Sequence, residues 1–160
     1  MTTDDSPRGP GLFSQTQIRH LMRIEFERAK RYGYPLTCML LEIDGLGAYR
    51  DRAGFDAKEA LLDDLILLLR KVTRTCDYIG RALDDRFLMV LPHTERDGAA
   101  VLAKRLQELS GELGGEGFEA RLSIGTSHFA DGVPVFFDVL LESAQAALTE
   151  AAGGGFVQGS

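Results

Sequence analysis

One stretch near the middle of the chain, residues 77–92 (DYIGRALDDRFLMVLP), most limits the folds open to this sequence. Two short apolar runs, residues 78–83 and 87–91, flank the charged residues Asp84, Asp85 and Arg86. An apolar, charged, apolar pattern of this length predicts a β-hairpin with a charged tip. A hairpin tip presents side chains to solvent from a rigid sheet, so this tip is a candidate place for chemistry.

Helices are predicted on both sides of the hairpin. Apolar residues recur at intervals of three and four over about residues 14–32, 56–74, 94–112 and 137–152, which predicts four amphipathic helices. Ser14 and Gln17 have the spacing of a capping box, and Thr94 is a predicted N-cap. We expect a loop or a short helical connection over residues 45–54.

Two further segments have the pattern of strands. Residues 36–43 are continuously apolar up to Glu42, which predicts a central strand covered on both faces. Glu42 and Asp44 stand two apart, so their side chains project from the same face. Residues 118–129 alternate, and Gly125 is predicted to mark a weak point or bulge. The order of elements predicts an α/β fold of the α+β type, with helices on an antiparallel or mixed sheet.

The composition predicts a single globular domain. The 44% hydrophobic and 26% charged residues are ordinary globular proportions, and the net charge of -6 argues against binding to nucleic acid or to an anionic membrane. We expect residues 1–13 and 157–160 to be tails outside a domain of residues 14–156. The sequence shows neither a membrane-spanning apolar run nor a signal peptide, so we expect the cytoplasm.

Cysteine and histidine residues predict no catalytic or metal site. Cys38 and Cys76 have no metal-ligand spacing and are expected to be free thiols in a reducing compartment. His20, His93 and His128 are scattered singly, so we expect structural or surface roles for them. No serine or cysteine has a partner at a spacing typical of a nucleophile.

Four phrases follow one another along the chain: residues 27–36 (ERAKRYGYPL), 41–44 (LEID), 81–92 (RALDDRFLMVLP) and 122–125 (LSIG). These phrases and the order of elements resemble the GGDEF domain, the diguanylate cyclase family that joins two GTP molecules into cyclic di-GMP. The resemblance covers about residues 14–156. The resemblance implies a nucleotide-cyclase palm, a ferredoxin-like arrangement in which helices flank a mostly antiparallel sheet.

The hairpin departs from the family signature, Arg-Tyr-Gly-Gly-Asp/Glu-Glu-Phe, because residues 81–87 are RALDDRF. Leu83 and Asp84 put side chains where glycines would let a nucleotide approach. The metal-ligand position of the signature is still acidic, as Asp85, but the catalytic glutamate is replaced by Arg86. By resemblance, Glu42 is the metal-binding acid of the first strand.

The resemblance therefore implies a vestigial active site and no catalysis, since phosphoryl transfer depends on positioning and on neutralising charge. The vestigial residues are Glu42, Asp84, Asp85 and Arg86. No cofactor is expected to be required. Two alternatives stay open: weak Mg²⁺ binding at Glu42 and Asp85, alone or with Asp44, and a residual enzyme or GTP sensor built on the same carboxylates.

A second family site matches this chain. The family's product-inhibition site is an Arg-x-x-Asp separated by five residues from the first glycine of the signature, and it falls on Arg74 and Asp77, with residues 78–82 before Leu83. An arginine can bind the acceptor edge of guanine or a phosphate, and an aspartate accepts from guanine N1 and N2. Arg105 and Arg28 match two further family positions, the second of which reaches ligand bound by a neighbouring subunit.

We therefore expect a non-catalytic receptor that binds cyclic di-GMP and signals through contact with an unidentified effector protein, with a ligand-linked homodimer through Arg28. Arg-x-x-Asp is a weak motif by itself, and a helix-terminal arginine followed by a turn aspartate would give the same pattern. The alternative function is a protein-interaction or scaffold module that binds no nucleotide.

Overall fold

The computed structural model describes residues 12–115 and 117–159, and six strands in this part of the chain form one sheet. The strands are β1 (Leu12–Phe13), β2 (Leu36–Ile43), β3 (Tyr78–Arg81), β4 (Phe87–Pro92), β5 (Leu122–Phe129) and β6 (Phe156–Gln158). Their order is β1-β3-β4-β2-β5-β6. Each of the four inner strands is antiparallel to the inner strand or strands next to it, and each edge strand is parallel to its neighbour. The predicted hairpin and the mostly antiparallel sheet are confirmed.

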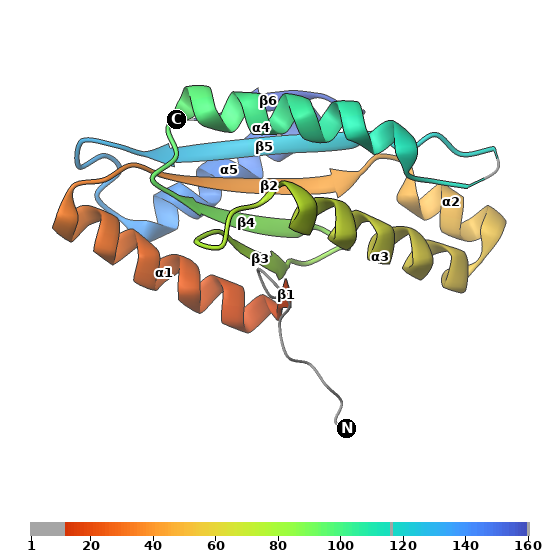
Figure 1. Ribbon diagram of the computed structural model, residues 1–160, viewed down its shortest axis with the longest axis horizontal. Helices are drawn as coiled ribbons and strands as arrows, with labels where there is room; N and C mark the ends of the chain where they lie inside the picture. The colour runs from red at the N-terminus through yellow and green to blue at the C-terminus, as the bar shows by residue number, and fades with distance from the viewer. Residues whose placement is uncertain (1–11, 116, 160) are drawn as a thin grey trace.

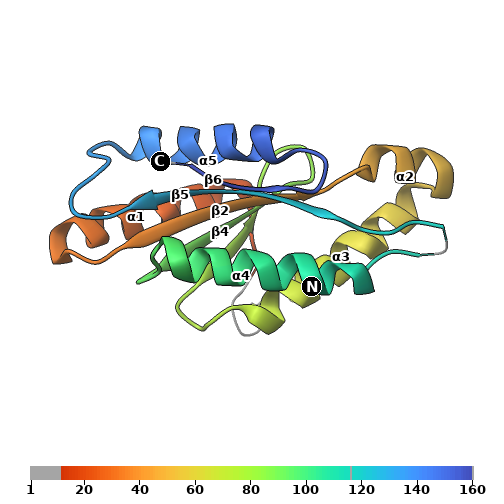
Figure 2. The same ribbon diagram turned by 90° about the horizontal axis from the view of Figure 1, so that it is seen from above.

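Helices cover both faces of this sheet. They are α1 (Gln15–Tyr32), α2 (Leu46–Ala53), α3 (Phe55–Val72), α4 (Arg96–Leu109) and α5 (Phe137–Ala151), with a 3-10 turn at Ser110–Glu112. Helices α1 and α5 lie on one face and α3 and α4 on the other, while α2 lies beyond the end of β2 (Figures 1 and 2). None of the helices in the described ranges has the length and apolar character to cross a membrane. The predicted fold class is confirmed.

Helix α1 and strand β2 form as their sequences predict. The Ser14 hydroxyl accepts from the backbone of Gln17, and the Gln17 side chain accepts from the Ser14 backbone, which completes the capping box. Gly33 ends the helix in the left-handed conformation, where glycine carries no steric cost. The strand that follows is buried along nearly its whole length because α1 and α5 pack on one face and α3 on the other.

Strand β5 has no bulge at Gly125, so that prediction was wrong. Gly125 pairs with Leu40 in a regular antiparallel register. A Cβ atom at Gly125 would lie 2.1 Å from the backbone nitrogen of Leu148 in α5, and one at Gly80 would lie 2.2 Å from Cβ of Ile18 in α1. The two glycines therefore let α5 and α1 approach opposite halves of the same sheet face.

Two segments predicted as tails contribute the edge strands. Leu12–Phe13 pairs with β3, and Phe156–Gln158 pairs with β5, so the tail prediction was wrong for residues 12, 13, 157 and 158. Both strands are held by partners distant in the sequence, and two or three residues carry no alternation from which to predict them. Predicted tail residues 1–11 and 160 lie outside the described residues.

Candidate functional site

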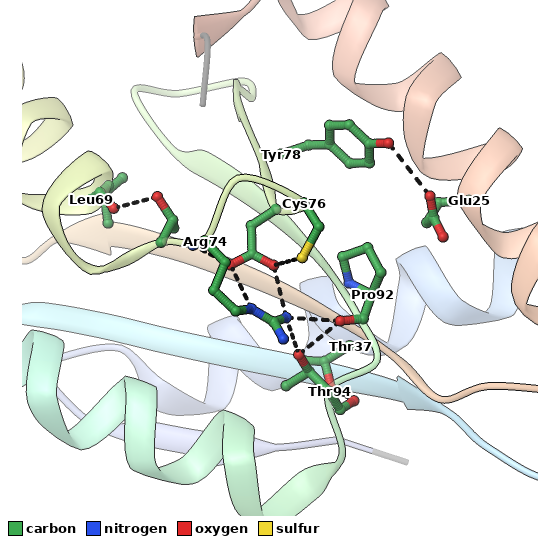
Figure 3. Close-up of polar contacts among 10 residues, drawn as sticks. Glu25, Thr37, Leu69, Arg74, Cys76, Tyr78, Pro92 and Thr94 are labelled. Atoms are coloured by element: carbon green, nitrogen blue, oxygen red, sulfur yellow. Dashed lines mark hydrogen bonds and ion pairs between the residues drawn. The ribbon is translucent and has the colours of Figure 1, made fainter. Parts of the chain in front are cut away.

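Arg74 and Asp77 lie in the turn between α3 and β3 and bind each other. The Arg74 guanidinium donates Nη2 to Oδ1 of Asp77 (2.9 Å) and Nε to Oδ2 (3.3 Å). The same Nη2 also donates to the Pro92 carbonyl oxygen (2.8 Å) and to the Thr94 hydroxyl (2.7 Å), as Figure 3 shows. These contacts hold the guanidinium between the turn and the segment that follows β4.

The two side chains of this pair differ in exposure. The side chain of Arg74 is 50% exposed, whereas that of Asp77 is 3% exposed. Asp77 also accepts the backbone N–H of Arg74 (2.8 Å), so its carboxylate is occupied within its own turn. The hydrogen bonds that Arg74 donates to Asp77 raise the pKa of the guanidinium. In this arrangement Asp77 positions Arg74, and Arg74 is the member of the pair that faces solvent.

Arg74 lines a groove of about 610 Å³ between this turn and α4. Other lining residues that bear on the argument are Asp77, His93, Thr94, Gly98 and Leu102. Arg105 is exposed one turn beyond Leu102, on the stripe of α4 that also carries Gly98. The structure thus brings Arg74 and Asp77 together and places Arg105 on the groove side of α4, beyond the residues that line the groove.

Arg28 is linked to the same turn through Glu25 and Tyr78. Its guanidinium lies 3.6 Å from the carboxylate of Glu25, which is 4% exposed. Glu25 accepts from the hydroxyl of Tyr78 (3.5 Å), as Figure 3 shows, and also from that of Tyr34. Tyr78 directly follows Asp77 in the sequence. Burial, together with the bond to Glu25, raises the pKa of Tyr34. Arg28 therefore lies on the α1 side of the turn. Glu25 and the two tyrosines bonded to it, which we call the Glu25 cluster, separate it from the groove.

The segment after β4 contains two site residues that sequence reasoning missed. Helix α4 begins at Arg96 with Glu95 as N-cap, so the prediction that Thr94 caps it was wrong. The Thr94 hydroxyl instead accepts from Arg74 and donates to the Pro92 carbonyl oxygen (3.1 Å). His93, expected to be structural or on the surface, is exposed, stacks on Tyr34 at 3.9 Å between ring centroids and lines the groove. No local pattern marks either residue.

The hairpin tip forms a second site, a cleft of about 330 Å³ at the end of β2. Its charged lining residues are Glu42, Asp44, Arg50, Lys58, Asp84 and Asp85. Arg86 donates Nε to Oε1 of Glu42 (2.9 Å), and Lys58 donates Nζ to Oδ2 of Asp85 (3.1 Å). Each carboxylate expected to bind Mg²⁺ therefore has a cation of the chain against it.

Lys58 is the residue of this cleft that the sequence did not reveal. It is 7% exposed, and its ammonium also lies 3.3 Å from Oε2 of Glu59. The pKa of Lys58 is raised, mainly because its ammonium donates a hydrogen bond to Asp85. Across the described ranges, the structure gathers no group of three or more His, Cys, Asp or Glu side chains placed to hold a metal ion. A divalent cation at Glu42 and Asp85 would compete with Lys58 and Arg86 for these two carboxylates.

The sheet order, the paired helices on both faces and the hairpin between β3 and β4 together define a cyclase-like domain of the GGDEF type. The chain belongs to the GGDEF family, because the family model described as diguanylate cyclase, GGDEF domain, matches residues 10–157. The resemblance seen in the sequence is thereby confirmed at the level of the family.

Individual relatives agree with this assignment. A diguanylate cyclase of Vibrio cholerae is 31% identical over 86 residues, which are 54% of this chain and 27% of the relative. The chain spans about a quarter of the length of the curated relatives that it matches first.

Solved structures show the same fold. The active GGEEF domain of a diguanylate cyclase from Vibrio cholerae has a TM-score of 0.84 at 24% identity, covering 92% of this chain and 97% of that one. The GGDEF domain of DgcB from Caulobacter crescentus, in complex with cyclic di-GMP, has a TM-score of 0.85 at 15% identity, covering 99% and 94%.

Proposed function

We propose that this GGDEF domain is a non-catalytic receptor that binds cyclic di-GMP in the groove beside Arg74 and signals by contact with an effector protein. The observation that carries the proposal is the half-exposed Arg74 guanidinium, fixed by Asp77, Pro92 and Thr94 in a groove of about 610 Å³. That volume lies within the usual range for small-molecule sites. The DgcB domain, which shares the fold, is in complex with the same dinucleotide.

The other residues of the binding set have different roles in this proposal. Asp77 sets the position of the guanidinium, whose Nε and Nη2 atoms are bonded to Asp77, Pro92 and Thr94. Its Nη1 atom, which bonds to none of these three residues, is then in place to donate to guanine O6 or N7 or to a phosphate. Arg105 assists from α4, because it extends the stripe that Gly98 and Leu102 contribute to the groove. Arg28, on the far side of the Glu25 cluster, contacts ligand held by a second protomer, which gives a ligand-linked homodimer.

The ion pairs of the hairpin-tip cleft support the proposal that the domain is non-catalytic. Phosphoryl transfer needs metal ions and cations arranged around the phosphates. Here Glu42 is paired with Arg86 and Asp85 with Lys58, so the two carboxylates that would hold a metal ion by resemblance each carry a protein cation. Leu83 and Asp84 add side chains at the tip of the degenerate signature, where a nucleotide would lie against glycine backbone.

Calorimetric titration of three proteins with cyclic di-GMP tests the proposal. Wild type is expected to bind, and Arg74→Ala to bind at least about tenfold more weakly, because a charge-assisted hydrogen bond is lost. Lys71→Ala, an exposed cation in the last turn of α3, is the matched control and should bind as wild type does. Equal affinities for Arg74→Ala and Lys71→Ala would remove Arg74 from the site.

Exposed apolar side chains favour the second candidate, a scaffold that binds no nucleotide. Val133, Val135, Phe136 and Val139 are exposed where the β5–α5 loop enters α5, and clustered apolar exposure often marks a protein-binding surface. The scaffold predicts that partner capture is indifferent to cyclic di-GMP and to Arg74→Ala. The receptor predicts that capture changes with the dinucleotide and that Arg74→Ala abolishes the change.

A further inference from the structure

A separate pocket of about 140 Å³ lies on the opposite face of the sheet from the groove, between α1, α5 and the β3–β4 turn. Its deep wall is apolar, because Ile18, Leu40 and Leu88 are each less than 5% exposed and Leu141 packs beside them. Groove residues such as Leu91 belong to the other core of the sheet. The pocket therefore shares no lining residue with the groove.

The rim of this pocket is positively charged. Arg19 of α1 and Arg81 at the end of β3 line it, and neither forms an ion pair with an acidic residue in the described part of the chain. Arg86 also lines it but donates Nε to Glu42, and Asp84 is the single acidic lining residue. Within the described residues, the guanidinium groups of Arg19 and Arg81 thus line the pocket without a carboxylate partner, in a chain whose net charge is -6.

The size of the pocket limits what it can hold. A cavity of about 150 Å³ lined by aliphatic side chains is large enough for benzene. Ala82 contributes only a methyl group to the lining, so the space above it is open. An apolar group of about six carbon atoms fits the deep part, and a carboxylate attached to it would reach the rim.

We propose that this pocket binds a small organic monocarboxylate whose apolar part has about the size of a benzene ring. The apolar part lies against Leu40, Leu88 and Leu141, and the carboxylate accepts from the guanidinium groups of Arg19 and Arg81. A single negative charge matches the rim, because Arg86 is already engaged by Glu42 and Asp84 offsets one of the two other guanidinium charges. This site is independent of cyclic di-GMP binding at Arg74.

Phenylacetate and its uncharged analogue phenylacetamide are matched probes for an NMR titration of the leucine methyl groups. Phenylacetate is expected to shift the signals of Leu40, Leu88 and Leu141 saturably. Phenylacetamide is expected to bind at least about tenfold more weakly than phenylacetate. Arg19→Gln, an exposed site that the fold does not need, should weaken phenylacetate about tenfold. Arg31→Gln at the other end of α1 is the control and should change nothing.

A substitution that fills the pocket gives a second test. Ala82→Tyr is expected to abolish the phenylacetate shifts while cyclic di-GMP titration and circular dichroism stay as in wild type. The proposal is overturned by equal binding of the amide, by Arg19→Gln that binds like wild type, by the absence of any shift, or by shifts at Leu91 and Leu102 of the groove instead.

Discussion

The Nε atom of Arg86 lies 2.9 Å from Oε1 of Glu42, and the two side chains are 30% and 27% exposed. Lys58 and Asp85 form a parallel contact at 3.1 Å in the same cleft. In both pairs a cation of the chain contacts one oxygen of the carboxylate. Two carboxylates at the hairpin tip are therefore engaged by the chain's own cations, whereas the guanidinium of Arg74 in the groove is half exposed.

Removing Arg86 should expose Glu42 to metal. Arg86→Ala is expected to raise the affinity for Mg²⁺ about tenfold, because the carboxylate loses its ion pair at a partly exposed position. It should still form no cyclic di-GMP from GTP. Mg²⁺ titration by calorimetry checks the first outcome and chromatography the second. Arg50→Ala, which lines the same cleft and pairs with Asp51, is the control. Unchanged Mg²⁺ affinity in Arg86→Ala would contradict the neutralised-cleft interpretation.

A larger side chain at Gly98 of α4 should block binding of the dinucleotide while Arg74 itself is unchanged. Gly98 lines the groove, and the nearest atom to a Cβ built there is Cγ2 of Thr94 at 3.6 Å, an ordinary contact. Gly98→Leu is therefore expected to fold, with a gain of about 0.5 to 1 kcal/mol from helix propensity. Its affinity for cyclic di-GMP should fall more than about tenfold, whereas Gly98→Ala should bind nearly as wild type. Retained binding in Gly98→Leu would place the ligand elsewhere.

Gly125→Ala should destabilise the fold strongly. The added Cβ would lie 2.1 Å from the backbone nitrogen of Leu148, so α5 would have to move away from β5. We expect a loss of about 3 kcal/mol or more in the free energy of unfolding, measured with urea. Gly47→Ala in α2, where a Cβ meets nothing within 4 Å, should instead be neutral or stabilising by up to about 1 kcal/mol. Similar effects at both positions would contradict the packing account.

Acid should weaken the fold partly through His128. This side chain is 7% exposed and hydrogen-bonded to the hydroxyls of Thr37 (2.9 Å) and Thr126 (3.0 Å). Burial and, to a smaller extent, the charge of Arg96 lower the pKa of His128 from 6.5 to about 4. The unfolded chain therefore takes up the proton first as the pH falls. The stability due to the neutral imidazole is complete above about pH 6.5 and is lost as the pH falls towards about 4.

Between about pH 7.5 and about pH 5 this linkage should cost about 2 kcal/mol of unfolding free energy. His128→Gln should lose less stability over that interval than wild type in urea titrations at the two pH values. The exposed His20→Gln is the control and should behave as wild type. An equal loss in wild type and His128→Gln would show that His128 does not carry the effect.

The sequence predicted the elements whose signals are local. Helices α1 and α3 have long amphipathic repeats, β2 is a long apolar run, and the hairpin is framed by its own charged tip. The edge strand β6 was missed because its three residues are held by pairing to β5 and not by any pattern of their own. Thr94 was misassigned for a similar reason, since its partner is Arg74 in another turn.

The candidate site was predictable only in part. Arg74 and Asp77 were assigned by resemblance to the Arg-x-x-Asp of the family, but the mutual bonding that buries Asp77 depends on the turn geometry. Lys58 was overlooked because a lysine in a helical repeat normally indicates a solvated face, and its burial arises from contact with Asp85 across 27 positions of sequence.

An amide-resolved NMR titration of the wild-type protein with cyclic di-GMP tests the central claim most directly, because it reports both whether the ligand binds and where. The account predicts saturable shifts in the turn of Arg74 and Asp77 and across the groove at Thr94 and Gly98, with the amides of the hairpin-tip cleft unchanged. Absence of shifts, or shifts confined to that cleft, would contradict it.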